Sequence, residues 1–495
     1  MAKGQLFAKK SVAQIQAEFS KGELKRTLGP LNLVSLGVGA IIGAGIFVIT
    51  GQAAATAAGP ALIISFIMAG MVCAFAGLCY AELASTMPVS GSAYSYAYVT
   101  MGEVFAWAMG WLLLLEYGIA ASTVAVGWSG YVTSLLGDLG VTIPAVFANS
   151  TLQYVAGEGL QPTPSLNLVA ALGVLAVTGL LVVGVSESAK VNNVIVLVKV
   201  GVLLLFIGMG VFYMKPENWV PFVPPAGEKF GQFGVSGIFV AAASVFFAYV
   251  GFEAVSTAAG EAKNPGKDLP FGILGSLFIC TVLYILTTLV LTGVVNYTQL
   301  NVKEPMAVAA DAMNVPWFSW LIKIGAVTGL SSVMLVLVYA QTRVFYQMSK
   351  DGLLPGLFGR VNQTFRTPAN GTVLLGVVIA IAAATLPLGV LGDLVSLGTG
   401  AAFLIVCLSV LYLRKSHPDL VRPFRVPFFP VLPIIGVLLC LFVVILPIFV
   451  KKIDSALRGD PIPLGLLVSY FLIGVLVYAF FGYRNSKITH PQPAE

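Results

Sequence analysis

Long apolar runs recur along the whole chain, and they constrain its fold more than any other feature. Each run has about 20 residues, enough for an α-helix to cross the roughly 30 Å hydrocarbon core of a bilayer. Charged residues make up only 10% of the 495, against about 25% in a typical soluble domain. A chain so poor in charge cannot cover a water-facing surface. We therefore expect an integral membrane protein built from helices.

Hydropathy predicts an all-α membrane protein with twelve transmembrane helices and no soluble domain. The expected spans are 30–56, 61–86, 103–135, 166–184, 191–213, 233–260, 269–296, 317–342, 369–388, 392–413, 431–450 and 463–483. We divide the chain into a cytoplasmic tail (1–29), a first five-helix unit (30–214), a second five-helix unit (215–413), two further helices (414–483) and a second cytoplasmic tail (484–495).

The basic residues indicate the topology. If the N-terminus is inside, the tails and the inward loops hold 19 of the 27 Lys and Arg, and the outward loops hold 6. This is the positive-inside bias, which places both termini in the cytoplasm. The net charge of +6 is thereby explained without a nucleic-acid partner. We expect a multi-pass protein of a bacterial plasma membrane.

Neither a metal site nor a cofactor is expected. All five cysteines lie within apolar spans, without the spacing of a disulfide framework or a metal site. The first 29 residues lack the apolar core and cleavage site of a signal peptide, although 12–19 has an amphipathic pattern. No sequence motif of a metalloprotease, a serine hydrolase or a P-loop is present, and we expect no paired acids within the membrane. The protein is therefore not expected to be an enzyme.

The order of the spans predicts an internal repeat. Spans one to five and six to ten can be aligned with an offset of about 200 residues, and each set begins with a span of poor helix-forming sequence. A unit with an odd number of spans reverses its orientation in the second copy. We therefore predict a 5+5 inverted repeat, with discontinuous first and sixth spans that meet at the bilayer midplane.

Four glycines within nine residues weaken the first span as a helix. They are Gly37, Gly39, Gly43 and Gly45. Each costs about 1 kcal/mol relative to alanine in a helix. A break would free N–H groups near Ala44 and Gly45 and carbonyls near Ile41 and Ile42, which the carboxylate and ammonium of an amino acid could satisfy. From the glycines alone, close packing against another helix explains the pattern equally well.

The sixth span favours a binding site over simple packing. It carries Gly251 and the acid Glu253 close to a cluster of aromatic residues. The same combination of glycine and polar group then stands at matching places in both halves. Phe246 or Phe247 could close over a ligand as a gate.

Lys199 lies deep in the fifth span, where a lysine costs at least about 2.5 kcal/mol to insert. One explanation is that its chain snorkels to the surface, but about two helical turns separate it from Asn192. The hypothesis that we favour is that Lys199 binds and releases the coupled proton and keeps sodium from the same position. Ser331 and Ser332 in the eighth span could satisfy Lys199 or the carbonyl of Gly39.

Other polar and bulky residues within the spans leave alternatives open. Glu116 in the third span could attract a cationic side chain in the pocket or pair with a neighbouring helix. Glu253 is a second proton group or, as we favour, a structural partner of the break. Met334 would narrow the pocket or pack in the core. We expect Glu82 and Glu103 to pair near the cytoplasmic ends.

Five aromatic residues lie near the end of the second span, just after it, or near the start of the third. They are Tyr80, Tyr94, Tyr96, Tyr98 and Trp107. Tyrosine and tryptophan are enriched where the bilayer meets water. We therefore expect most of the five to be interfacial.

Several motifs resemble those of a known superfamily. The segments 41–47 (IIGAGIF), 80–88 (YAELASTMP), 91–98 (GSAYSYAY), 102–103 and 251–253 (GFE) resemble the amino acid–polyamine–organocation superfamily. The segments 107–117 (WAMGWLLLLEY), 124–131 (VAVGWSGY), 351–355 (DGLLP) and 422–433 look like its cationic amino acid transporter branch, in the shorter bacterial form of the ApcT type. The match covers residues 28 to about 440.

The resemblance implies that the backbone of a substrate is held at both breaks. The positions that match are Ile41, Ile42, Gly43, Ala44, Gly45 and Ile46 in the first span, and Phe247, Ala248 and Val250 with the adjoining Gly251 in the sixth. It also matches Lys199 to the fifth-span lysine of proton-coupled members. Met334 departs from the smaller residues of the animal cationic carriers, which makes alanine-sized substrates plausible beside arginine and lysine.

These observations together predict a proton-coupled amino acid symporter that works by alternating access. It would need no cofactor beyond the proton gradient, and its expected partners are an amino acid and the lipid bilayer. Whether a protein subunit joins it is left open. The alternatives are an exchanger of the same fold and a membrane amino acid sensor without transport.

Overall fold

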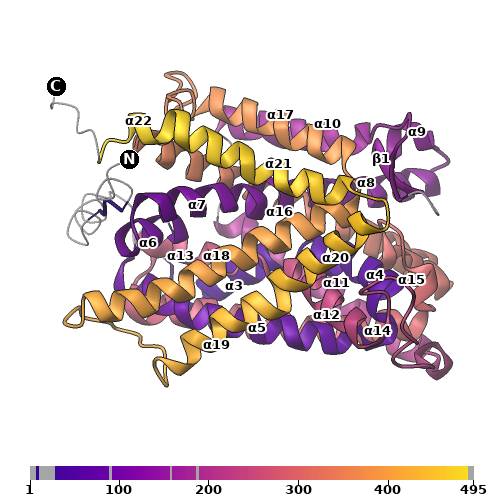
Figure 1. The fold of residues 1–495 in the computed structure, drawn as a ribbon. Helices are drawn as coiled ribbons and strands as arrows, with labels where there is room; N and C mark the ends of the chain where they lie inside the picture. The colour runs from indigo at the N-terminus through magenta and orange to yellow at the C-terminus, as the bar shows by residue number, and fades with distance from the viewer. Residues whose placement is uncertain (1–6, 11–27, 89–91, 156–158, 185–188, 489–495) are drawn as a thin grey trace.

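The computed structural model describes residues 7–10, 28–88, 92–155, 159–184 and 189–488, so the amphipathic stretch 12–19 lies outside it. Long helices run side by side along a common direction (Figure 1). The α-helices of the first half are α3 (Pro30–Ile41), α4 (Thr50–Ala53), α5 (Leu62–Thr86), α6 (Ser92–Thr100), α7 (Glu103–Leu113), α8 (Ala120–Asp138), α9 (Ala145–Ala148), α10 (Leu168–Val183) and α11 (Ala189–Gly210). Those that follow are α12 (Gly234–Val245), α13 (Ala254–Thr257), α14 (Pro265–Val294), α15 (Pro305–Ala312), α16 (Pro316–Lys350), α17 (Ala369–Thr385), α18 (Leu388–Ser416), α19 (Val431–Leu439), α20 (Leu446–Leu457), α21 (Ile462–Val477) and α22 (Tyr483–Asn485).

Several helices are continued or interrupted by tighter or wider turns. The π-helical turns are Gly45–Ile49, Ala54–Ala58, Leu114–Ile119, Cys440–Ile445 and Tyr478–Gly482. The 3₁₀ turns are Gly59–Ala61, Val211–Tyr213, Pro216–Trp219, Phe246–Tyr249, Ala258–Glu261 and Tyr297–Gln299. π-helical turns occur in the first span and 3₁₀ turns in the sixth, the two spans where the sequence predicts breaks.

Nine helical runs in the described part of the chain are long and apolar enough to cross a membrane. The first, Pro30–Thr86, is 57 residues long and contains the first two expected spans. Gly59, with φ at 57°, opens the turn between them. The shorter apolar helices α10 and α17 lie where the fourth and ninth spans are expected. Each expected span thus coincides with helical backbone, and some helices extend further, as α16 does to Lys350.

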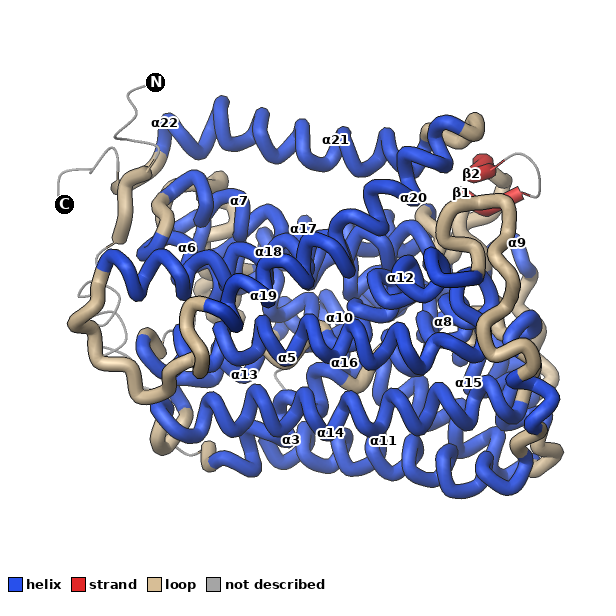
Figure 2. The backbone as a smooth tube through the Cα atoms, turned by 60° about the horizontal axis from the view of Figure 1, so that its bottom comes forward, coloured by secondary structure: helices blue, strands red, loops and turns tan. Residues whose placement is uncertain are grey.

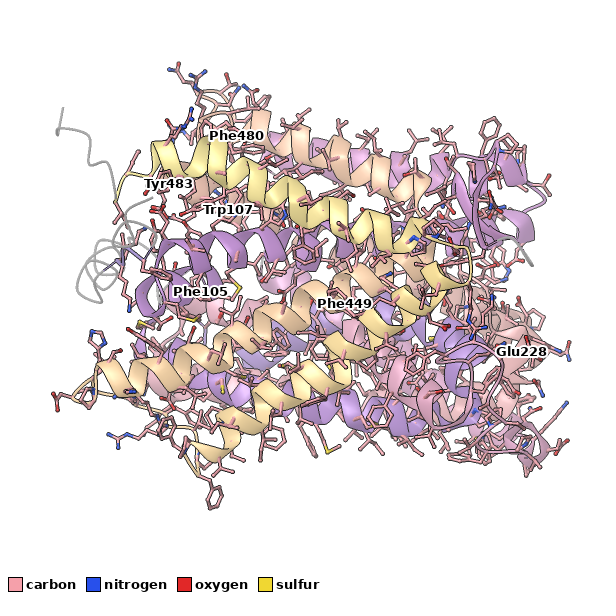
Figure 3. All side chains as sticks on the ribbon, viewed as in Figure 1. Phe105, Trp107, Glu228, Phe449, Phe480 and Tyr483 are labelled. Carbon is pink, nitrogen blue, oxygen red and sulfur yellow. The ribbon has the colours of Figure 1, made fainter. Side chains whose placement is uncertain are left out.

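The outside of the bundle is apolar. Leu197, Phe278 and Phe480 expose 73%, 72% and 67% of their surface. Soluble proteins rarely expose large apolar surfaces to water. Helix α21 lies along the margin of the bundle (Figures 1 and 2) and carries Phe480 on its continuation (Figure 3). Stacked rings of Trp111 and Tyr470, 5.3 Å apart, attach it to α7. The protein is therefore a multi-pass membrane protein.

The aromatic residues that we expected at the interface are buried instead, so this prediction was wrong. Tyr80, Tyr94, Tyr96, Tyr98 and Trp107 expose between 0% and 5% of their surface. Two of the hydroxyl groups find carboxylates at the end of the bundle: Tyr94 donates to Asp351 (2.8 Å) and Tyr98 donates to Glu103 (3.0 Å). Internal partners of this kind remove the need for water.

The expected pairing of Glu82 is confirmed. Its carboxylate is 1% exposed and accepts hydrogen bonds from Arg414 Nε (2.8 Å) and from the Val426 N–H (2.7 Å). Arg422 lies 3.5 Å away from it and also donates to backbone carbonyls, among them that of Leu420. The proline-rich motif is therefore a connector clamped to α5 by one buried carboxylate.

An element that the all-α prediction missed lies between α9 and α10. Strands β1 (Leu152–Val155) and β2 (Gly159–Pro162) form an antiparallel hairpin. Lys303, which precedes α15, donates to the Ala148 carbonyl and to Asn149 Oδ1 beside it. We call this the Lys303 end of the bundle.

Candidate functional site

The first span breaks at the predicted glycines. Helix α3 ends at Ile41, Ile42 is extended with ψ at 98°, and a π-helical turn begins at Gly45. Every residue from Ile41 to Ile46 is buried. The N–H groups that start the second half-helix have no partner within a preceding turn of that helix. This segment therefore presents backbone polar groups in the interior of the bundle.

The sixth span breaks at the matching place. Helix α12 ends at Val245, a 3₁₀ turn follows, and Gly251 has φ at 122°, which side-chain-bearing residues rarely adopt. Both carboxylate oxygens of Glu253 accept from the Gly251 N–H, at 3.1 and 2.9 Å. This contact bears out the structural role that we favoured for Glu253.

The two breaks touch each other through their glycines. A Cβ on Gly45 would lie 2.1 Å from Ala248 Cα, and one on Gly251 would lie 2.7 Å from the carbonyl carbon of Ala40. A Cβ on Gly43 would meet Val333 of α16 at 3.2 Å. The two explanations of the first-span glycines therefore hold together: the glycines interrupt the helix, and they allow close packing at the interruption.

Tyr284 of α14 joins both breaks, and the sequence analysis missed it. Its buried hydroxyl lies 2.8 Å from the Ile41 carbonyl and 2.9 Å from the Ala248 carbonyl, and it can donate its proton to one of them at a time. A tyrosine in mid-span must find a polar partner, and this rule was the available signal. The hydroxyl therefore lies against the Ile41 carbonyl, where we expected the substrate ammonium. It also lies against the carbonyl of Ala248, a position that the resemblance assigns to the substrate backbone.

Lys199 and Gly39 come together as the sequence suggested. The Lys199 ammonium, 1% exposed, donates to the Gly39 carbonyl at 2.9 Å. A Cβ on Gly329 of α16 would lie 3.1 Å from Lys199 Cγ, so the lysine chain packs along that glycine. Ser332, one helical turn after Gly329, is buried on the same side of α16. Lys199 thus links α11 to the first half-helix of the broken span.

Ser331 does not serve this link, and that prediction was wrong. Its hydroxyl accepts from Trp128 Nε1 (2.9 Å) and donates to the Val327 carbonyl (2.8 Å). Successive residues on a helix point in different directions, so Ser331 and Ser332 cannot both face Lys199. Ser331 instead joins α16 to α8.

Glu116 stands apart from the lysine. It lies in the π-helical turn Leu114–Ile119 and is fully buried. Its side chain lies beside that of Glu253, and neither Glu116 oxygen accepts a hydrogen bond from a described donor. The expectation of unpaired intramembrane acids is therefore wrong, because helices far apart in sequence bring these two together.

The remaining predicted residues are bulky and apolar. Met334 is 1% exposed, Phe247 is 5% exposed, and Phe246 is fully buried. The Phe246 ring packs against Phe403 of α18, with centroids 5.5 Å apart. Phe246 therefore belongs to a cluster with α18, which leaves Phe247 as the better candidate for a gate.

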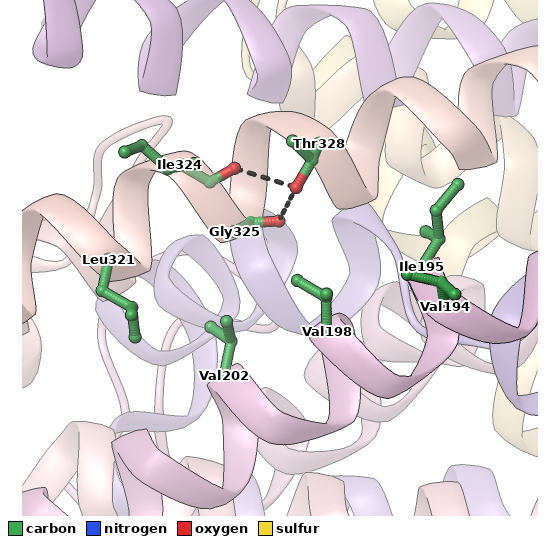
Figure 4. Close-up of a pocket in the computed structure, with 8 residues that line it drawn as sticks. All are labelled: Val194, Ile195, Val198, Val202, Leu321, Ile324, Gly325 and Thr328. Carbon is green, nitrogen blue, oxygen red and sulfur yellow. Dashed lines mark hydrogen bonds between the residues drawn. The ribbon is translucent and has the colours of Figure 1, made fainter. Parts of the chain in front are cut away.

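A separate groove of about 350 Å³ lies between α11 and α16. Its lining is apolar and includes Val198, Val202, Ile324 and Gly325 (Figure 4). Val198 directly precedes Lys199 in sequence, yet the ammonium points to Gly39 instead. This groove offers few polar atoms to an amino acid, so we distinguish it from the candidate site at the breaks.

Two interrupted helices that meet inside a lipid-facing bundle are typical of secondary transporters. A family model described as amino acid permease matches residues 28–481. The chain is 46% identical to the methylthioribose transporter of Bacillus subtilis (strain 168), over 98% of this chain and 99% of that protein. It is 43% identical to the branched-chain amino acid permease BcaP of the same organism, over 98% and 99%. It is 38% identical to the vacuolar cationic amino acid transporter 4 of Arabidopsis thaliana, over 80% of this chain and 64% of that protein.

The chain therefore belongs to the amino acid permease family, within the superfamily that its motifs resemble. Its relatives are permeases and transporters, not enzymes.

Proposed function

We propose that this protein is a proton-coupled amino acid symporter that works by alternating access. In this account it has twelve spans with an inverted 5+5 repeat, both termini in the cytoplasm and a place in a bacterial plasma membrane. The paired breaks support the repeat, and the distribution of Lys and Arg supports the topology.

The hydrogen bond from Lys199 to Gly39 is the single observation that carries the proton coupling. As an ammonium, Lys199 ties α11 to the half-helix before the first break. A neutral amine donates more weakly to a carbonyl than a cation does. Loss of the proton would therefore loosen this tie and allow the first half-helix to move relative to α11. The same ammonium excludes sodium by charge.

An α-amino acid fits the polar groups of the two breaks. Its carboxylate would accept from the N–H groups of Ala44 and Gly45, where the second half-helix begins. Its ammonium would donate to the carbonyls of Ile41 and Ala248, to which Tyr284 now lies close. Binding would thus displace the tyrosine hydroxyl from at least one of them.

We assign a neutral aliphatic amino acid as the substrate. Phe247 lies in the sixth-span break, Val333 meets Gly43 of the first, and both are apolar and buried, as is Met334 beside Val333 in the chain. Glu116 interacts with Glu253. This favours a side chain without charge over arginine or lysine. A relative named for branched-chain amino acids supports the assignment, whereas relatives named for cationic amino acids make arginine and lysine the second candidates.

The test is thermal stabilisation of the purified full chain by each of the twenty amino acids and by methylthioribose, since one relative is named for that compound. Neutral aliphatic amino acids should raise the unfolding temperature most. Stabilisation by arginine and lysine, or by methylthioribose alone, would overturn the substrate assignment.

Flux in proteoliposomes separates the remaining alternatives. A symporter accumulates substrate under a proton gradient, and an exchanger requires substrate on the far side of the membrane. Binding without any flux would identify a sensor.

A further inference from the structure

Two intramembrane carboxyl groups lie next to each other inside the bundle. Glu116 and Glu253 both have 0% exposure, and their side chains interact. None of the ion pairs among the described residues includes either of them. The pair therefore has no positive partner to balance two negative charges.

Helix α18 packs against the residues that adjoin the two acids in the chain. A Cβ on its Gly398 would lie 2.5 Å from Cβ of Leu115, the neighbour of Glu116. Its Phe403 ring is 5.0 Å from the ring of Phe252, the neighbour of Glu253. Tyr80 places its ring edge against both phenylalanines, at 5.6 and 5.5 Å. Tyr80 and Tyr117 also lie near both acids, and charge is poorly solvated in such a buried setting.

The two carboxyl groups differ in their hydrogen bonds. Glu253 accepts from the Gly251 N–H with both oxygens, which stabilises its ionised form. Neither oxygen of Glu116 accepts a hydrogen bond from a described donor, and the buried polar atoms of Gln341 are equally unsatisfied. An ionised Glu116 would combine repulsion from Glu253 with an uncompensated buried charge. A protonated Glu116 would avoid both and gain a donor for Glu253.

We propose that Glu116 and Glu253 hold one proton between them and form a proton-binding site separate from Lys199. The proton resides on Glu116, whose O–H donates to the Glu253 carboxylate. The titratable groups that face the pair are the phenols Tyr80 and Tyr117 and, toward Glu253, the thiol of Cys73. Among the described residues, no Lys, Arg or His is a neighbour of Glu116.

The position of the pair gives it a role beyond charge balance. Glu253 holds the Gly251 N–H, so release of the shared proton would repel Glu253 from Glu116 and disturb the sixth-span break. Lys199 is bonded to Gly39 just before the first-span break. Each broken span then has its own proton-sensitive contact, one basic and one acidic.

Infrared absorption of the purified, membrane-reconstituted full chain tests the site directly. A protonated carboxyl has a C=O stretch that is separate from the bands of carboxylates, so the protonated form can be followed against pH without any transport assay. The wild type should show one buried protonated carboxyl that is lost on raising the pH. Glu116→Gln should remove this band because Glu253 alone is ionised.

Glu253→Gln distinguishes a shared proton from a merely buried one. Its band should persist, but its midpoint should move to lower pH because the neighbouring negative charge is gone. Glu228 is exposed at the Lys303 end of the bundle (Figure 3), so Glu228→Gln should leave the band unchanged. A wild type without the band, or a midpoint that is the same with and without Glu253, would overturn the proposal. Loss of the wild-type band on adding sodium would identify a cation site instead.

These outcomes do not depend on the substrate or on Lys199. A failure of this site is therefore distinguishable from a failure of the proposed symport. Unfolding temperatures of each variant show whether it folds, and Glu116→Asp retains the carboxyl if Glu116→Gln does not fold.

Discussion

Substitution of the first-span glycines should destabilise the protein in a graded order. Gly45→Ala places a Cβ 2.1 Å from Ala248 Cα and 2.4 Å from its Cβ, and backbone cannot move away by changing rotamer. Gly43→Ala meets only the end of the Val333 side chain, at 3.2 Å, which can give by a few tenths of an ångström. The structure therefore predicts a large effect at Gly45 and a small one at Gly43.

Overpacking typically costs about 1–3 kcal/mol. We expect Gly45→Ala to lower the free energy of unfolding by about 3 kcal/mol or more, because the clash is with main chain. Gly43→Ala should lower it by about 1 kcal/mol or less. Gly201→Ala is the matched control, since it lies within α11 and its Cβ meets nothing within 4 Å. It should be neutral or stabilising by up to about 1 kcal/mol.

The assay is the apparent unfolding temperature of each purified variant, with ligand-induced stabilisation measured in parallel. Gly45→Ala should lower the unfolding temperature most and abolish the ligand effect. Equal effects of Gly45→Ala and Gly201→Ala would refute the contact between the two breaks, because both changes add the same methyl group to an apolar helix.

Three further changes test other contacts. Tyr284→Phe leaves the carbonyls of Ile41 and Ala248 without their donor and should cost about 1–3 kcal/mol, seen as a lower unfolding temperature that substrate partly restores; a variant as stable as the wild type would contradict the bridge. Arg414→Gln removes one partner of the buried Glu82 carboxylate and should cost about 3 kcal/mol, with denaturation curves as the check and exposed Arg458→Gln as the control. Burial raises the pKa of Glu304, which lies outside the spans. The free energy of unfolding therefore falls as the pH rises from the ordinary glutamate pKa through this raised pKa, and at acid pH, where Glu304 is protonated, nothing is lost. Glu304→Gln should therefore raise the unfolding temperature at neutral and alkaline pH but not at acid pH, and a pH-independent difference would refute this sign.

Local sequence patterns were enough to place the helices and both breaks. The runs of apolar residues identify the helical segments, and the clustered glycines with Gly251 identify where two of them fail. Lys199 was recognisable as a site residue because a buried charge is costly wherever it stands, and its partner Gly39 lay within the weakened span.

Contacts between distant segments could not be predicted in the same way. Glu116 and Glu253 are 137 residues apart in the chain, and only the folded structure brings their side chains together. Tyr80 and Tyr94 were predicted to be interfacial because their internal partners lie on segments distant in sequence, which local patterns do not reveal. The direction of Ser331, toward Trp128, depends on a rotation of α16 that the sequence leaves undetermined.

The central claim is proton coupling through Lys199. The most direct measurement is accumulation of a neutral aliphatic amino acid in proteoliposomes with an imposed pH gradient, acid outside, in the absence of sodium. The wild type and an exposed-lysine control, Lys215→Ala, should concentrate the substrate, whereas Lys199→Ala should lose acid-stimulated uptake. Accumulation by Lys199→Ala with the wild-type pH dependence would contradict the account.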